Sequence, residues 1–97
     1  MHDIKLPVLE KNDRWSEHVL KLTEEYNELL CAFLKEDSIR FEDVIEETLD
    51  LIQVCIGILD KLDTDRPGIV RLSAMKHIEK LHSRGWKFKK WLYINED

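Results

Sequence analysis

The segment from Phe41 to Leu62 constrains the fold most, because it is apolar over more than half of its helical circumference at 100° per residue. A helix with so wide an apolar surface is usually buried on more than one side. In a chain of 97 residues, a subunit interface is the natural second cover. We therefore expect one all-α domain over residues 1–97, an antiparallel helical bundle completed by homo-oligomerisation as a homodimer or homotetramer.

Two further helices are predicted beside this segment. The first begins near Asp13 or Ser16, either of which could cap it, and follows helical spacing to about Lys35. A strong turn signal over residues 63–68 separates the second helix from a third, which is expected over Ile69–Ser83.

The residues after the third helix combine aromatic and basic side chains. Gly85 stands where a C-terminal helix cap belongs. The tail from Trp86 to Ile94 could be a fourth short helix, an extended arm or a segment exchanged between subunits. Its aromatic residues are expected to pack against a partner subunit or to close a base pocket; they are Trp86, Phe88, Trp91 and Tyr93.

Composition excludes several classes of protein. Hydrophobic residues make up 43% and charged residues 36%, as in a folded and highly charged helical protein. Three glycines and two prolines are too few for the turns of an all-β fold. The net charge of −5 argues against general nucleic-acid binding. No signal peptide and no apolar run near 18 residues is visible, so we expect a cytoplasmic protein with no membrane partner.

Cys31 and Cys55 are the only cysteines, and they match no CxxC pattern. Both fall inside predicted helices. We interpret them as buried or half-buried free thiols of a reducing compartment.

Two short acidic pairs lie beside apolar residues. Glu25 and Glu28 are three residues apart on the first helix and border its apolar arc. Glu47 and Asp50 repeat the spacing on the second helix, where Glu47 falls inside the apolar surface. If the helices pack antiparallel, the four carboxylates converge, and that arrangement is unfavourable unless a cation neutralises them. An all-oxygen set suits Mg²⁺, with Mn²⁺ able to substitute.

At this point the sequence resembles the MazG-like nucleoside triphosphate pyrophosphohydrolases. Glu24-Glu25-x-x-Glu28, followed after eighteen residues by Glu47-x-x-Asp50, is similar to the family's EExxE…ExxD pattern. The segment with His77, Lys80 and Arg84 looks like the family's Asn-x-x-Lys-x-x-x-Arg pattern, with His77 in place of the usual Asn. The resemblance spans about Trp15 to Trp86.

The resemblance implies an all-α enzyme that is at least dimeric. It implies that Mg²⁺ binds through Glu25, Glu28, Glu47 and Asp50, and that a nucleoside triphosphate is cleaved between its α- and β-phosphates. Glu24 or one of the ligands would orient or deprotonate the attacking water.

Further residues are candidates for binding the substrate. Lys80 and Arg84 lie one turn apart and would bind phosphate oxygens. Lys21 is a weaker phosphate candidate, Trp15 could stack on a nucleobase, and His77 could contact the sugar or a phosphate. Which base and sugar the substrate carries is left open by the sequence.

Two alternative functions remain open from sequence alone. The first is a non-catalytic helical interaction module. The second is a carboxylate-bridged di-iron or manganese protein, for which Glu79 and His82 form an ExxH pair on the third helix.

Overall fold

All regular structure in the described residues, 4–10, 14–35 and 38–92, is α-helical in the computed structural model. This result confirms the expected all-helical class. The three helices are α1 (Trp15–Phe33), α2 (Phe41–Asp65) and α3 (Ile69–Ser83). None of them is long and apolar enough to cross a bilayer.

The start of α1 differs from the prediction. Its N-cap residue is Arg14, whose side chain makes no capping hydrogen bond, and Ser16 already lies within the first turn. The other predicted cap, Asp13, lies outside the described residues. The expectation of a side-chain cap from Ser16 is therefore wrong.

The chain divides into two compact units, and each is described by itself. One unit is Val8–Lys61, and the other joins Met1–Pro7 to Leu62–Asp97. The expectation of a single domain over the whole chain stays a prediction.

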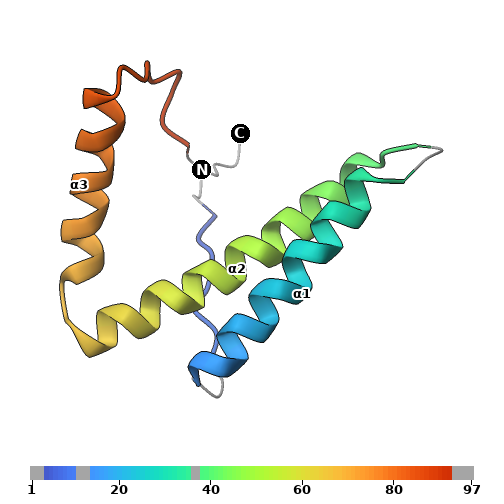
Figure 1. Ribbon diagram of the computed structural model, residues 1–97, viewed down its shortest axis with the longest axis horizontal. Coiled ribbons are helices and arrows are strands. Elements are labelled where there is room, and N and C mark those ends of the chain that lie inside the picture. Colours follow the sequence, from blue (N-terminus) through green and yellow to red (C-terminus); the bar gives the residue numbers. More distant parts are fainter. Residues whose placement is uncertain (1–3, 11–13, 36–37, 93–97) are drawn as a thin grey trace. The chain divides into compact units, whose positions relative to one another are not determined.

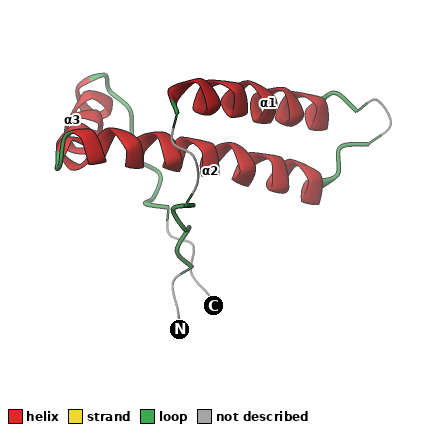
Figure 2. Cartoon of the chain, turned by 90° about the horizontal axis from the view of Figure 1, so that it is seen from below, coloured by secondary structure: helices red, strands yellow, loops and turns green. Residues whose placement is uncertain are grey.

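The unit Val8–Lys61 is built on a helical hairpin. Helix α1 lies antiparallel to α2 in both views (Figure 1, Figure 2), as the sequence predicted for these two helices. The most deeply buried side chains in the described part of the unit are His18, Ala32 and Val54, with exposed fractions of 2%, 4% and 6%. With so few residues fully buried, the hairpin has a thin core.

The apolar arc of α1 is not the surface that α2 covers. His18 and Ala32 are buried and lie within about 20° of Glu25 on the helical wheel. The predicted apolar arc instead stays exposed, with Val19 at 62%, Tyr26 at 54% and Phe33 at 50%. Helix α1 therefore presents its polar and small residues to α2 and its apolar arc to solvent.

Helix α2 also has an uncovered apolar face. Ile45, Ile52 and Leu59 are exposed and lie at about 120–160° from Glu47 on the wheel, on the side opposite the carboxylates. Cys31 and Cys55 are both exposed as well, so the expectation of buried or half-buried thiols is wrong for the single chain.

The connection between α1 and α2 is tied by an ion pair. The Lys35 ammonium donates to Asp43 Oδ2 at 2.9 Å, joining the residues after α1 to the first turn of α2. This hydrogen bond, with the charge of Lys35, lowers the pKa of Asp43. Both groups reach solvent, so the pair alone stabilises the hairpin only slightly.

Helix α3 is bounded by two glycines with positive φ. Gly68, at φ 88°, is the N-cap residue and has no side chain to accept a capping hydrogen bond. Asp63 Oδ1 accepts a hydrogen bond from the Val70 N–H instead, at 3.2 Å. At the other end, Gly85 has φ 83°, its N–H donates to the His82 carbonyl, and the Trp86 N–H donates to the Leu81 carbonyl. These two bonds form a Schellman motif and confirm Gly85 as the predicted C-terminal cap.

The described part of the tail has no regular structure. Residues 86–92 form neither helix nor strand, so the option of a fourth helix fails for them. The Phe88 ring lies edge-on to His82 and to Trp91, at centroid distances of 6.4 and 5.6 Å. Tyr93 lies outside the described residues.

We predict that Gly85→Ala lowers the free energy of unfolding by about 1 kcal/mol, because an L-residue is strained at this positive φ. Urea denaturation followed by circular dichroism would measure it. Lys87→Ala, in the exposed tail, is the control and should have little effect. A Gly85→Ala variant as stable as the wild type would contradict the prediction.

Candidate metal centre

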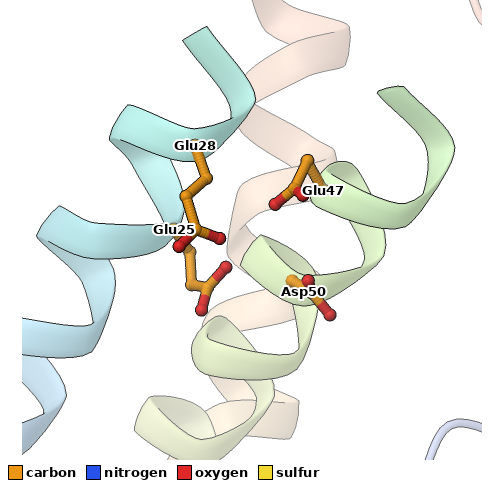
Figure 3. Close-up of side chains that lie close together, drawn as sticks. All are labelled: Glu25, Glu28, Glu47 and Asp50. Atoms are coloured by element: carbon orange, nitrogen blue, oxygen red, sulfur yellow. The ribbon is translucent and has the colours of Figure 1, made fainter. Parts of the chain in front are cut away.

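Four carboxyl groups meet between α1 and α2. Figure 3 shows Glu25 and Glu28 extending from α1 toward the two acidic residues of α2. One oxygen from each of the four residues lies within 4.8 Å of the others. The group consists of Glu25, Glu28, Glu47 and Asp50 and is called the carboxylate cluster below.

Local helical geometry explains this arrangement. Residues three apart lie on neighbouring positions of one helical face, so each helix offers two carboxylates on the same side, about 4.5 Å apart along its axis. The antiparallel packing of α1 and α2 then brings the two pairs face to face. The small side chain of Ala32, buried at 4% exposed, belongs to the same face of α1.

Two oxygens of the carboxylate cluster are buried without a partner. Glu25 Oε2 and Glu47 Oε2 are inaccessible to solvent and accept no hydrogen bond from the described residues. Glu25 and Glu47 are half-buried as whole residues, while Glu28 and Asp50 are exposed. A buried carboxylate oxygen with no donor is destabilising, so the cluster is well suited to an external cation.

The pKa values of Glu25 and Glu47 also indicate that negative charge is unfavourable in the carboxylate cluster. Burial, more than any other cause, raises the pKa of Glu25 and of Glu47 above the usual value of 4.5, and a hydrogen bond with Glu28 adds to both shifts. Repulsion from Glu28 and Asp50 acts in the same direction. The helices therefore hold negative charges closer together than the charges alone would favour.

The ligand set fits a hard divalent cation such as Mg²⁺. All donors are carboxylate oxygens, which Mg²⁺ and Mn²⁺ prefer. Ligands about 2.1 Å from Mg²⁺ span at most about 4.2 Å, so a spread of 4.8 Å needs only a small contraction. No other group of three or more possible ligands from His, Cys, Asp and Glu is found in the described part of the chain.

Glu24 and Lys21, two predicted site residues, lie next to the cluster and contact each other. The Lys21 ammonium lies 3.2 Å from Glu24 Oε2. That hydrogen bond is the main cause that raises the pKa of Lys21, and the charges of Glu25 and Glu28 contribute. Glu24 is not among the four converging residues, so its predicted role in orienting water stays a prediction.

Trp15 is the first residue of α1, whereas the cluster residues lie near the middle of that helix. It is ten positions before Glu25, which is about 15 Å along the helix. Its ring centroid lies 5.6 Å from that of His18 and 5.1 Å from the Lys61 ammonium. These contacts give Trp15 a structural role in the hairpin, and base stacking stays a prediction.

The remaining predicted residues lie on or directly after α3, in the other unit. Lys80 and His77 lie on α3, and Arg84 is its C-cap. Their predicted roles in phosphate or sugar binding stay predictions. The di-iron candidates Glu79 and His82 also lie on α3, and His82 contacts Phe88.

Apart from Lys21, sequence reasoning missed the non-ligand residues that surround the cluster within its own unit. Two hollows open beside it. The first, of about 190 Å³, is lined by Leu9, Lys21, Glu25, Asp50, Gln53 and Val54. The second, of about 370 Å³, is lined by Asn27, Glu28, Cys31, Ala32, Lys35, Asp43 and Glu47. The Lys35–Asp43 ion pair could not be predicted, because the two residues lie eight apart across a connection whose geometry no local sequence pattern specifies.

Comparison with known proteins identified no relative: no family model, no curated protein and no solved structure matches the chain.

We predict that Glu47→Gln raises the melting temperature of the metal-free protein at neutral pH, because it removes a charge from the cluster. A raised pKa means that the folded state binds the proton more tightly than the unfolded state. The stability given by protonation is therefore present below about pH 4.5 and is lost as pH rises through the raised pKa. The difference between variant and wild type should accordingly shrink on acidification. Melting curves in chelator between pH 4 and pH 8 would measure this.

Glu46→Gln is the matched control, since Glu46 is the exposed neighbour on α2 and lies outside the cluster. Its effect should be small and should not follow the same pH dependence. A Glu47→Gln variant that melts at or below the wild-type temperature in chelator at neutral pH would contradict an electrostatically strained cluster.

Proposed function

We propose that this chain is a Mg²⁺-dependent nucleoside triphosphate pyrophosphohydrolase of MazG-like type. Its reaction consumes one water, breaks the anhydride bond between the α- and β-phosphates, and yields a nucleoside monophosphate and pyrophosphate. The observation that carries the proposal is the convergence of four carboxylates, with two buried oxygens that have no donor in the described residues.

Glu25, Glu28, Glu47 and Asp50 would hold the cation. When bound, Mg²⁺ neutralises phosphate charge and makes a water molecule more acidic. The exposed sides of Glu28 and Asp50 leave the cluster open to solvent, so a phosphate chain has access from outside. A carboxylate of the cluster, or the nearby Glu24, would accept the proton of the attacking water.

The basic residues have complementary roles in this proposal. Lys21 would balance charge beside the cluster, where it already contacts Glu24. Lys80 and Arg84, on α3 and at its C-cap, would bind phosphate oxygens, with Arg84 offering a planar pair of donors. His77 would contact the sugar or a phosphate, and Trp15 would stack on the base.

We further propose that the active form is a homodimer or homotetramer. The apolar arc of α1 and the apolar face of α2 are exposed in the single chain, and exposed apolar surface of this kind is typical of subunit interfaces. A second copy that buries both faces would extend the two-helix hairpin into a bundle and add the core that the chain lacks.

The predicted reaction is tested with a nucleotide panel. Purified protein with Mg²⁺ is incubated with standard and modified NTPs and dNTPs, and the products are separated by anion-exchange chromatography. We expect monophosphate and pyrophosphate from at least one substrate, and a loss of about 100-fold or more in Glu47→Gln, because the cation site is incomplete.

Glu46→Gln serves as the control and should retain activity, because Glu46 lies outside the carboxylate cluster. A monophosphate product with equal rates in wild type and Glu47→Gln would contradict the assignment of the cluster as the catalytic centre. The absence of both turnover and Mg²⁺ binding would contradict the enzymatic proposal as a whole.

The oligomer is tested by light scattering after size-exclusion chromatography. We expect the wild type to have a multiple of the 11.6 kDa chain mass. Ile52→Glu places a charge on the exposed apolar face of α2 and should shift the protein toward the single-chain mass, whereas Glu46→Gln should not. A wild type that stays at 11.6 kDa at every concentration would contradict the proposal.

A further inference from the structure

The two hollows beside the carboxylate cluster differ in chemistry, and each contains one lysine. Both belong to the unit Val8–Lys61. The Lys21 hollow includes the apolar side chains of Leu9 and Val54 together with the amide of Gln53. The Lys35 hollow is larger, and its lining includes Asn27 beside the charged groups.

The two lysines also differ in their surroundings. The Lys21 ammonium lies 3.2 Å from Glu24 Oε2 and also interacts electrostatically with Glu25 and Glu28. Several carboxylates therefore already neutralise its charge. Among the described residues, Lys35 forms an ion pair with Asp43 at 2.9 Å. Its side chain is 52% exposed, so it can exchange this carboxylate for another anion with little rearrangement.

The place of Lys35 relative to the cluster is suited to phosphate. Lys35 lines the same hollow as Glu28 and Glu47, which supply two of the cluster's four carboxylates. An anion in this hollow would therefore be near both the carboxylate oxygens of the candidate cation site and an ammonium. A compact ammonium with three donors binds phosphate oxygens well, and a phosphate carries more charge than the carboxylate that it displaces.

We infer that Lys35 is a further substrate-binding residue. Its ammonium gives up the ion pair with Asp43 and binds the terminal phosphates of the substrate in the hollow that Lys35 lines together with Glu28 and Glu47. The inference rests on the proposed function, since the terminal phosphates are those that leave as pyrophosphate. Without substrate, Asp43 keeps the Lys35 ammonium at the edge of the hollow. When substrate binds, Asp43 competes with the phosphate for that ammonium.

The two partners of the ion pair therefore have opposite effects on anion binding. Removing the Lys35 charge weakens binding of pyrophosphate, while removing the Asp43 charge removes a competitor and strengthens it. A purely structural ion pair behaves differently, because losing either partner then gives the same small loss of stability and no change in anion binding.

The experiment is calorimetric titration of pyrophosphate, in saturating Mg²⁺, into four proteins: wild type, Lys35→Gln, Lys35→Arg and Asp43→Asn. We expect about tenfold weaker binding in Lys35→Gln and roughly threefold tighter binding in Asp43→Asn. Lys35→Arg should bind within a few-fold of the wild type, because a guanidinium also binds phosphate. Melting curves of each variant confirm that it is folded.

Titration of Mg²⁺ alone separates the two proposals. Suppose that the wild type binds Mg²⁺ and that all four proteins bind pyrophosphate with equal affinity. This result overturns the role of Lys35 and does not contradict the proposed function. The role of Lys35 is also overturned if Lys35→Gln weakens binding of a nucleoside monophosphate but not of pyrophosphate, or if the wild type binds Mg²⁺ but no pyrophosphate. A wild type that binds no Mg²⁺ overturns both proposals.

Discussion

The repulsion among four carboxylates held between α1 and α2 is the interaction on which the rest of the structure depends. One oxygen of each residue lies within 4.8 Å of the others, and Glu25 and Glu47 each have a buried oxygen with no donor in the described residues. Helix packing brings them together despite the cost, and burial raises the pKa of Glu25 and Glu47. A cation among the oxygens would relieve this repulsion, which is why we propose that the hairpin binds one.

The same constraint explains why the apolar faces of the hairpin lie elsewhere. Because the cluster lies between the two helices, few of the hairpin's described side chains are deeply buried, namely His18, Ala32 and Val54, and much of the wide apolar arcs lies elsewhere. Those arcs, with Tyr26 on α1 and Ile52 on α2, stay exposed in the single chain. In our proposal a second copy covers them, so that metal binding and subunit association use opposite sides of one hairpin.

Local patterns in the sequence were sufficient to predict the helices and the four converging residues. Helix α3 has the predicted bounds. Helix α2 continues to Asp65, three residues beyond the predicted end at Leu62, because the first residues of the predicted turn are still helical. The acidic pairs were detectable because residues three apart share a helical face. The contact face of α1 could not be predicted, because it depends on how the two helices pack. The Lys35–Asp43 pair could not be predicted either, because it depends on a connection whose geometry no local pattern specifies.

The most direct test of the account is to locate a cation rather than to infer it from activity. Crystals grown with Mn²⁺, which has a measurable anomalous signal, would be examined for a peak between α1 and α2. The account predicts one ordered ion coordinated by oxygens of Glu25, Glu28, Glu47 and Asp50. A well-ordered hairpin with these carboxylates in place and no anomalous peak among them, at saturating Mn²⁺ and neutral pH, would contradict it.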